Sequence, residues 1–257
     1  MKKREAVMEE IRSASFTTPT SGIADGYAQA NLVVLDKAYA FDFLVYCERN
    51  KKACPILDVT DVGSPKPVLT GHQNDLRTDL PKYQVYEAGK LVKSVNDVTE
   101  YWTEDSVAFL LGCSFTFEEA LRQNGIPIRH NEEKCNVPMF ETNIDTIPAG
   151  PFSGPMVVSM RPMSQQDAVR AVQVTSRFPD VHGAPIHIGD PKAIGIDDIQ
   201  TPDYGDAVTI KEGEVPVFWA CGVTPQAAAK ANGLSMITHA PGHMYITNVK
   251  NETLGVL

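Results

Sequence analysis

The sequence predicts an α/β protein with a mixed sheet, helices on both faces of that sheet, and a smaller inserted α+β layer. Apolar stretches with strand character alternate with segments of helical periodicity along the chain, which is typical of this class. Pro and Gly clusters separate these stretches. The 257 residues, 43% of them apolar, can bury a large core and are near the size at which single cores begin to divide.

The first half of the chain predicts two helices, a short strand and a hairpin. Charged and apolar residues predict an amphipathic helix over 4–15, and a turn-rich TTPTSG follows it. Asp36 is a suitable N-cap for a second helix, in which apolar residues recur at helical spacing. A short strand is expected after Cys54. Residues 82–95 alternate apolar and polar positions around Ala88-Gly89, which indicates a β-hairpin. The alternation of strands and helices along the chain predicts that at least part of the sheet is parallel.

The second half repeats the alternation of strands and helices. Its predicted elements, in order, are a buried strand and a helix ending at Asn124-Gly125 (105–125), a strand (156–162), a helix with Ser164 as N-cap (164–178), a short strand (184–191), two strands around Glu212-Gly213 (206–220), a helix (224–233), and a strand, turn and strand (235–249). The Pro/Gly-rich stretch 137–155 is the best candidate boundary. We therefore expect a main domain of residues 1–114 and 191–257, and a smaller inserted subdomain of residues 115–190.

Composition excludes several classes of function. The net charge is −9 and no stripe of Lys and Arg is present, which argues against a nucleic-acid partner. No apolar run approaches the roughly 20 residues that span a bilayer, and the basic start carries three glutamates and no apolar core of a signal peptide. The five cysteines form no C-x-x-C pair, so neither a disulfide framework nor a structural zinc site is expected. A soluble, cytoplasmic protein is the expectation, and the sequence leaves a homo-oligomer open.

An internal repeat gives the most informative pattern. Residues 107–127 align without gaps to residues 215–235, and the matched pairs are Val107 and Val215, Cys113 and Cys221, Thr116 and Thr224, Ala120 and Ala228, Asn124 and Asn232, and Gly125 and Gly233. A short apolar stretch that ends in histidine follows each unit, at His130 and at His239. The chain thus contains two units of strand, cysteine, helix, Asn-Gly, strand and histidine.

The repeat predicts chemistry at the start of each helix. Unpaired N–H groups there lower the pKa of a thiol and bind carboxylates. If the two units face each other, Cys113 and Cys221 flank one pocket. The structural alternative is that strand-to-helix corners favour small residues, in which case both cysteines only fit the space.

Other side chains are weaker candidates. His182, His187 and Asp190 lie within nine residues, but strand positions five apart face opposite ways, which disfavours joint metal ligation. His239 and His243 flank a Pro-Gly turn that folds them toward one place. Arg77, Arg129 and Arg161 could each grip a carboxylate through a bidentate fork. For each of these residues an ordinary structural role is the more common explanation. Nothing matches a nucleotide fingerprint, so no cofactor is expected, and no metal is predicted.

Long segments of the chain together resemble the bacterial hydro-lyase family related to D-glutamate cyclase. They include FLVYCERNKKACPIL, FLLGCSFTFEEAL, AGPFSGPMVVSMRP, HGAPIHIGDP, PVFWACGVTPQAA and THAPGHMYIT, within about residues 15–248. The resemblance implies a carbon–oxygen lyase of amino-acid metabolism that expels water, with closure of D-glutamate to 5-oxo-D-proline as the leading example. No cofactor is needed, and the partner is a small-molecule carboxylate.

That reaction needs a base, an acid and an anchor for carboxylates. The residues that we assign to catalysis are Cys113, Cys221, His130 and His239. Those assigned to substrate binding are Ser114, Thr224, Arg161, Arg129 and Arg77. Further candidates are His182, His187, His243 and Glu118.

Two alternatives stay open. The paired GCS and ACG corners are similar to the paired cysteines of cofactor-independent aspartate and glutamate racemases, which implies proton transfer at an α-carbon by Cys113 and Cys221. The third hypothesis is a non-catalytic protein that binds a small carboxylate, with both cysteines structural.

Overall fold

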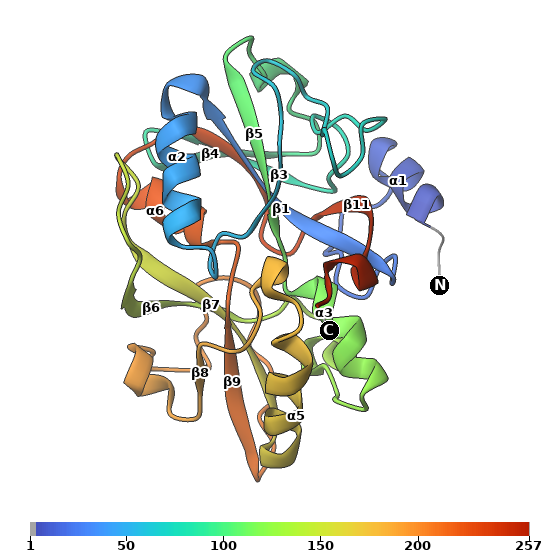
Figure 1. Ribbon diagram of the computed structural model, residues 1–257, viewed down its shortest axis with the longest axis vertical. Coiled ribbons are helices and arrows are strands. Elements are labelled where there is room, and N and C mark those ends of the chain that lie inside the picture. Colours follow the sequence, from blue (N-terminus) through green and yellow to red (C-terminus); the bar gives the residue numbers. More distant parts are fainter. Residues whose placement is uncertain (1–3, 257) are drawn as a thin grey trace.

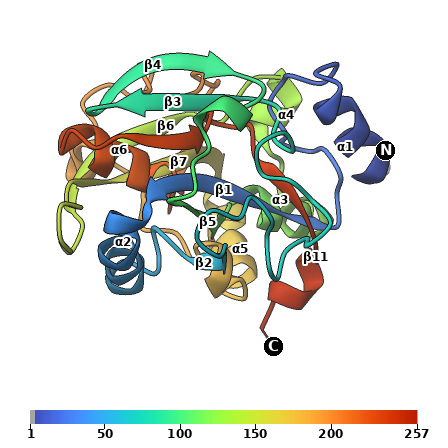
Figure 2. The same cartoon turned by 90° about the horizontal axis from the view of Figure 1, so that it is seen from above.

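The computed structural model describes residues 4–256, which build two antiparallel sheets that meet at a central junction (Figure 1). The first sheet has the strand order β2-β5-β1-β10-β3-β4, and β11 also pairs with β1. Figure 2 shows β3 and β4 at one side of this sheet and β2 at the other. Its strands are β1 (Tyr27–Asp36), β2 (Ile56–Val59), β3 (Tyr83–Glu87), β4 (Lys90–Val95), β5 (Ser106–Gly112), β10 (Met236–His239) and β11 (Tyr245–Lys250).

Helices cover the first sheet on both faces. Helix α1 (Arg4–Arg12) places Val7, Met8 and Ile11 in the same apolar cluster as the even-numbered residues of β1. Helix α2 (Lys37–Arg49) packs Phe43 on the opposite face, in a cluster with the odd-numbered residues of β1. Because both faces are buried, β5 reads as a continuous apolar run, and all seven of its residues are buried.

The second sheet has the strand order β6-β7-β9-β8. Its strands are β6 (Met139–Asp145), β7 (Pro155–Ser164), β8 (His187–Ile188) and β9 (Glu214–Ala220). Helices α3 (Phe115–Gln123) and α5 (Gln165–Thr175) cover one face, where Phe117, Ala171 and Trp219 share a buried cluster. The other face is closed by the segment that carries Ile194, Ile196 and Val208.

The remaining elements are short. They are α4 (Arg129–Glu133), α6 (Thr224–Ala231) and the 3₁₀ turns η1 (Thr99–Tyr101), η2 (Pro179–Val181), η3 (Pro191–Ile194) and η4 (Asn251–Leu254). No helix within residues 4–256 is both long and apolar enough to cross a membrane.

The two repeated units connect the sheets in a crossed manner. Strand β5 belongs to the first sheet, but α3, which follows it, packs Phe117 and Leu121 against the second. Strand β9 belongs to the second sheet, but α6 packs Ala228 and Ala229 into the core of the first. The two strand-to-helix corners therefore both lie at the junction between the sheets.

The mixture of helices and strands confirms the predicted α/β class, and the helices on both faces of the first sheet agree with it. The expected parallel pairing is wrong, because every strand pair in the described part of the chain is antiparallel. Alternation of strands and helices predicts parallel order only when successive strands join the same sheet, and here the chain crosses between two.

Two predicted strands are absent from the part of the chain that the structure describes, whereas the predicted hairpin is present. The apolar stretch before His130 is not a strand, since α4 begins at Arg129, and no strand precedes β9 around Glu212-Gly213. The hairpin is confirmed, with Ala88 and Gly89 at positive φ in its turn. The strands of the second sheet run from Met139 to Ala220, past residue 190, and the division into domains itself stays a prediction.

Candidate active site at the junction of the sheets

The two predicted cysteines lie in one buried cluster at the junction. This junction cluster consists of Cys113, Phe115, Val137, Met139, Val157, Cys221, Val223, Ala227 and Met244. Glycines make room for the corners: a Cβ on Gly112 would lie 2.2 Å from the carbonyl oxygen of Asp180, and one on Gly222 would lie 2.0 Å from Nδ2 of Asn31. The corners are thus packed against neighbouring strands and loops without spare volume.

Both thiols face backbone N–H groups but are not activated by them. Burial raises the pKa of Cys113, although the N–H of Phe115 contacts its Sγ at 3.5 Å and acts in the opposite direction. Burial likewise raises the pKa of Cys221 to about 11, against the N–H of Val223 and the charge of Arg161. The predicted lowering of the thiol pKa values is therefore wrong, because desolvation exceeds the effect of the helix N-termini.

A charged network lies beside the junction cluster. Arg161 of β7 is wholly buried and donates to Oε1 of Glu118 through Nε at 3.0 Å and Nη2 at 2.5 Å. Its Nη1 donates to Ser159 and its Nη2 to Ser114. The rings of Phe117 and Trp219 lie 5.6 and 5.4 Å from its guanidinium carbon. The sequence suggested that Arg161 binds a carboxylate of the substrate, whereas the carboxylate that it contacts in the structure is that of Glu118.

Glu118 joins this arginine to a histidine. Nε2 of His130, on α4, lies 3.1 Å from Oε1 of Glu118, and both side chains are almost fully buried. Burial alone would raise the pKa of Glu118, but His130 and Arg161 outweigh it and hold that pKa well below its usual range. Glu118 is therefore an ionised carboxylate in the interior.

A cavity of about 610 Å³ opens against this network. Its lining consists of Thr18, Pro19, Ser21, Gly22, Asp25, Arg122, His130, Asn131, Lys134, Cys135, Asn136 and Asp206. Ser21 and His130 form the part of the lining in contact with Glu118. Arg122 donates Nη2 to Asp25, while its Nη1 has no hydrogen-bond partner within residues 4–256. We call this space the His130 cavity.

The other predicted residues lie elsewhere. His239 is fully buried on β10, where Nδ1 accepts from the N–H of Leu32, and burial lowers its pKa to about 4. Thr224 bonds to the backbone of Val157 and Cys221. Arg129 is held by Glu132, Glu214 and a backbone carbonyl. Arg77 pairs with Asp75 in the loop before β3. None of these residues lines the His130 cavity.

The three remaining candidate histidines contact backbone carbonyls. His182 contacts the carbonyl of Lys52 at 2.8 Å, and burial lowers its pKa to about 4. His187 contacts that of Asp190, and His243 contacts those of Pro241 and Thr17. Within the described residues, no group of three or more His, Cys, Asp or Glu side chains is arranged to hold a metal ion.

Sequence reasoning missed Ser21, Asn131 and the cavity itself. The composition of the segment TTPTSG predicts only a turn. Ser21 of this segment contacts Glu118 on α3 and His130 on α4, which are 97 and 109 positions later in the sequence, and no periodicity connects them. The fold brings it there because the carbonyl of Gly242 accepts from both N and Oγ1 of Thr20, which fixes the segment against the loop after β10.

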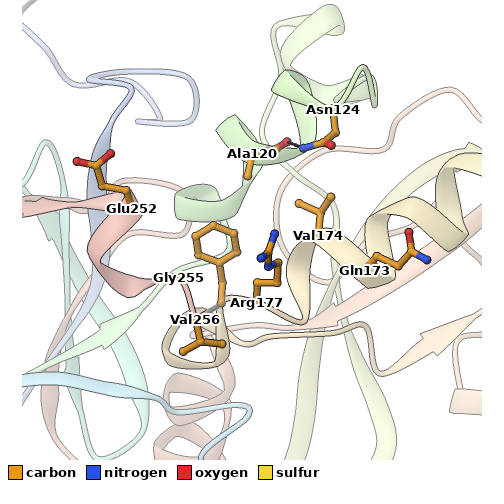
Figure 3. Close-up of a pocket in the computed structure, with 9 residues that line it drawn as sticks. Ala120, Asn124, Gln173, Val174, Arg177, Glu252, Gly255 and Val256 are labelled. Atoms are coloured by element: carbon orange, nitrogen blue, oxygen red, sulfur yellow. Dashed lines mark hydrogen bonds between the residues drawn. The ribbon is translucent and has the colours of Figure 1, made fainter.

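Another cavity, of about 440 Å³, lies between α3, α5 and the C-terminal segment (Figure 3). Its charged lining residues, Arg177 and Glu252, are exposed, and it holds no predicted site residue. Of these two cavities, the His130 cavity is the one that lies against the buried charges of Glu118 and Arg161. We therefore take it as the candidate site.

Comparison with known proteins gives the family. The sequence profile described as D-glutamate cyclase matches residues 107–248, which include both cysteine corners, Glu118, His130 and Arg161. A "putative hydro-lyase" of Bacillus licheniformis is 63% identical over 96% of this chain and 95% of its own length. Relatives with the same name from Geobacillus kaustophilus and Bacillus subtilis are 62% and 60% identical, over 100% and 96% of this chain and 98% and 96% of theirs. The chain therefore belongs to the D-glutamate cyclase family.

Proposed function

We propose that this protein is a hydro-lyase that closes D-glutamate to 5-oxo-D-proline and water in the His130 cavity. The observation that carries the proposal is the buried, ionised Glu118 in contact with His130, whose imidazole lines a cavity large enough for a small amino acid. An imidazole beside a fixed carboxylate can take up and return protons near neutral pH. The membership of the chain in the D-glutamate cyclase family supports the choice of substrate.

The reaction balances with one histidine. The substrate nitrogen forms a bond to Cδ, and one Cδ–O bond of the γ-carboxylate breaks. The ammonium group loses two protons in becoming the lactam N–H, and the departing oxygen gains both and leaves as water. His130 passes the protons and returns to its starting state. Glu118 stabilises the charged imidazole, and Arg161 holds Glu118 in place.

The cavity also offers groups of both signs for an amino dicarboxylate. Arg122 and Lys134 are cations of the cavity lining and suit the two carboxylates. Asp206 suits the ammonium group, while Asp25 is paired with Arg122. Arg161 does not line the cavity, and each of its three nitrogens bonds to a side chain of the protein.

The direct test is turnover. The purified protein is incubated with D-glutamate, L-glutamate and 5-oxoproline, and the products are followed by chiral chromatography. We expect ring closure of D-glutamate and its loss in His130→Gln. Full activity of His130→Gln would contradict the assignment of the site, and no product from either enantiomer would contradict the reaction.

Binding is mapped separately with Cys135. This half-buried cysteine lines the His130 cavity, whereas the other four cysteines are buried. We expect iodoacetamide to modify Cys135 first under native conditions, and D-glutamate to slow that modification. Cys135→Ser is the matched control, which should lack the fast phase. Protection without turnover would favour the non-catalytic binding protein.

The racemase-like alternative has one observation in its favour, the placement of Cys113 and Cys221 in the same junction cluster. Their raised pKa values disfavour thiolates in this conformation. Interconversion of the glutamate enantiomers, lost in both Cys113→Ser and Cys221→Ser, would support it. Full activity in both variants would remove the thiols from the mechanism.

A further inference from the structure

Ser21 has more hydrogen-bond contacts than one hydroxyl proton can serve. Its Oγ lies 2.9 Å from Oε2 of Glu118, 3.2 Å from Nε2 of His130 and 2.7 Å from Oδ1 of Asn131. A hydroxyl has one proton to donate and two lone pairs to accept. An ionised Glu118 can only accept, so the proton and the lone pairs of Ser21 must be divided among its neighbours.

Two divisions fit these distances. When His130 is charged, its Nε2–H points between Oε1 of Glu118 at 3.1 Å and Oγ of Ser21 at 3.2 Å, and the Ser21 proton turns to Oε2 of Glu118. When His130 is neutral and carries its proton on Nδ1, the Ser21 proton turns to Nε2. In the structure Oδ1 of Asn131 faces Oγ at 2.7 Å, and a half-turn of this amide would place Nδ2 there as a donor to a lone pair of Ser21 in both states. The hydroxyl can therefore change its donor direction without movement of the backbone.

The position of Ser21 gives this rotation a use. His130 is only 1% exposed and Glu118 is wholly buried, whereas Ser21 is half-buried and lines the cavity. A substrate in the cavity lies beside both Ser21 and His130, and Ser21, in contact with Nε2, is the more exposed of the two. The charged groups around the pair are Arg161 behind Glu118 and, in the cavity lining, Arg122, Asp25, Lys134 and Asp206.

We propose that Ser21 relays protons between the substrate and His130. In the forward step a substrate N–H bond breaks as an O–H bond forms on Ser21, while the original O–H bond of Ser21 breaks as Nε2–H forms. The reverse sequence delivers each proton to the departing oxygen. Ser21 is unchanged after each transfer, and no bond between Ser21 and carbon is formed. This inference rests on the proposed function of His130.

The test compares Ser21→Ala, Ser21→Thr and Ser15→Ala. Ser15 is an exposed serine of the same segment and serves as the control for loss of a hydroxyl. We expect Ser21→Ala to lower kcat about 100-fold, in the range for loss of a proton-transfer group, with KM changed little. Ser21→Thr keeps the hydroxyl and should restore most of the rate, and Ser15→Ala should match the wild type. A purely structural role would not give this separation of kcat from KM with rescue by threonine.

A second measurement does not depend on turnover. Exchange of the His130 Nε2–H with solvent is followed by NMR in the wild type and in Ser21→Ala. We expect the exchange to slow several-fold without the hydroxyl. Unchanged exchange, or an unchanged kcat in Ser21→Ala while His130→Gln is inactive, overturns the relay. Activity in His130→Gln would instead overturn the proposed function.

Discussion

Glu118 is wholly buried and yet ionised, because Arg161 and His130 both contact its Oε1. A buried pair of this kind is a poor source of net stability, since desolvation of both charges offsets their attraction. It is costly to break, however, because the remaining charge has no partner and no water. The role of Glu118 is thus to fix a charge beside His130, and the rest of the network keeps that charge in place.

Replacement of Glu118 by Gln should therefore destabilise the fold strongly. The Arg161 guanidinium would stay buried with neutral partners alone, the Gln carbonyl oxygen and the hydroxyls of Ser114 and Ser159, and loss of the charged partner costs on the order of 3–5 kcal/mol in the free energy of unfolding. Urea unfolding followed by circular dichroism measures the change. Glu104→Gln, at an exposed position, is the control and should have little effect. A loss below about 1 kcal/mol for Glu118→Gln would contradict a buried ion pair.

The buried histidines predict a loss of stability in mild acid. Burial lowers the pKa of His182 to about 4, below the roughly 6.5 of an unfolded chain, so the unfolded state binds the proton first. From this difference in pKa, neutral His182 contributes roughly 3 kcal/mol to the free energy of unfolding. This contribution is present above about pH 6.5 and is lost as the pH falls to about 4. We expect His182→Asn to flatten this part of the curve of unfolding free energy against pH. Asn tolerates the positive φ of 85° at this position.

The control for this comparison is His72→Asn, at an exposed histidine. It should reproduce the pH dependence of the wild type. If His182→Asn also did so, protonation of His182 would not drive the acid loss.

At the scale of elements, the corners after β5 and β9 show what a sequence can and cannot predict. The repeat correctly identified a strand, a cysteine and a helix in each unit, because each of these follows from a local pattern. The repeat could not show that β5 and β9 belong to different sheets. A strand that is buried on both faces has the same apolar run whichever sheet it joins. Parallel pairing was therefore expected and not found.

The same limit applies to the candidate site. Arg161 was singled out because it ends an apolar strand, and its burial follows from that position. The contact of Arg161 with Glu118 joins residues 43 positions apart in sequence, and the contact of His130 with Glu118 joins residues 12 positions apart. These contacts decide that His130, and not His239, belongs to the network beside the cavity. Ser21 lies 109 positions from His130, and no local pattern connects them.

The glycines of the corners should tolerate no side chain. Gly112→Ala places a Cβ against the backbone of Asp180 and Gly222→Ala places one against Asn31, closer than van der Waals contact allows. Each should lower the free energy of unfolding by about 1–3 kcal/mol or more, as overpacked cores do. Gly255→Ala is the control, because the nearest atom to its Cβ is 3.4 Å away and its φ is −84°. Thermal unfolding compares the three variants, and an unchanged Tm for both corner variants would disprove close packing there.

At the scale of the whole molecule, the junction cluster joins Met139 and Val157 of the second sheet to Cys113 and Met244, which directly follow β5 and precede β11 of the first sheet. Trp102 packs on the first sheet, and Trp219 is buried in the second. Trp102→Phe and Trp219→Phe each leave one reporter, since the chain has two tryptophans. We expect the fluorescence transition of each variant in urea to coincide with its own far-UV circular dichroism. A fluorescence change that precedes the loss of secondary structure would show that the sheets unfold separately.

The crossed connection of the corners has a consequence for how the gene could be divided. A fragment that ends after β5 would lack β10 and β11, which pair with β1, and would also lack α6, which packs Ala228 and Ala229 in one cluster with Tyr86. A fragment that begins at β6 would carry the second sheet without α3 over Trp219. Each half thus depends on elements encoded in the other half's sequence, so neither is expected to be inherited, transplanted or expressed as a self-sufficient piece.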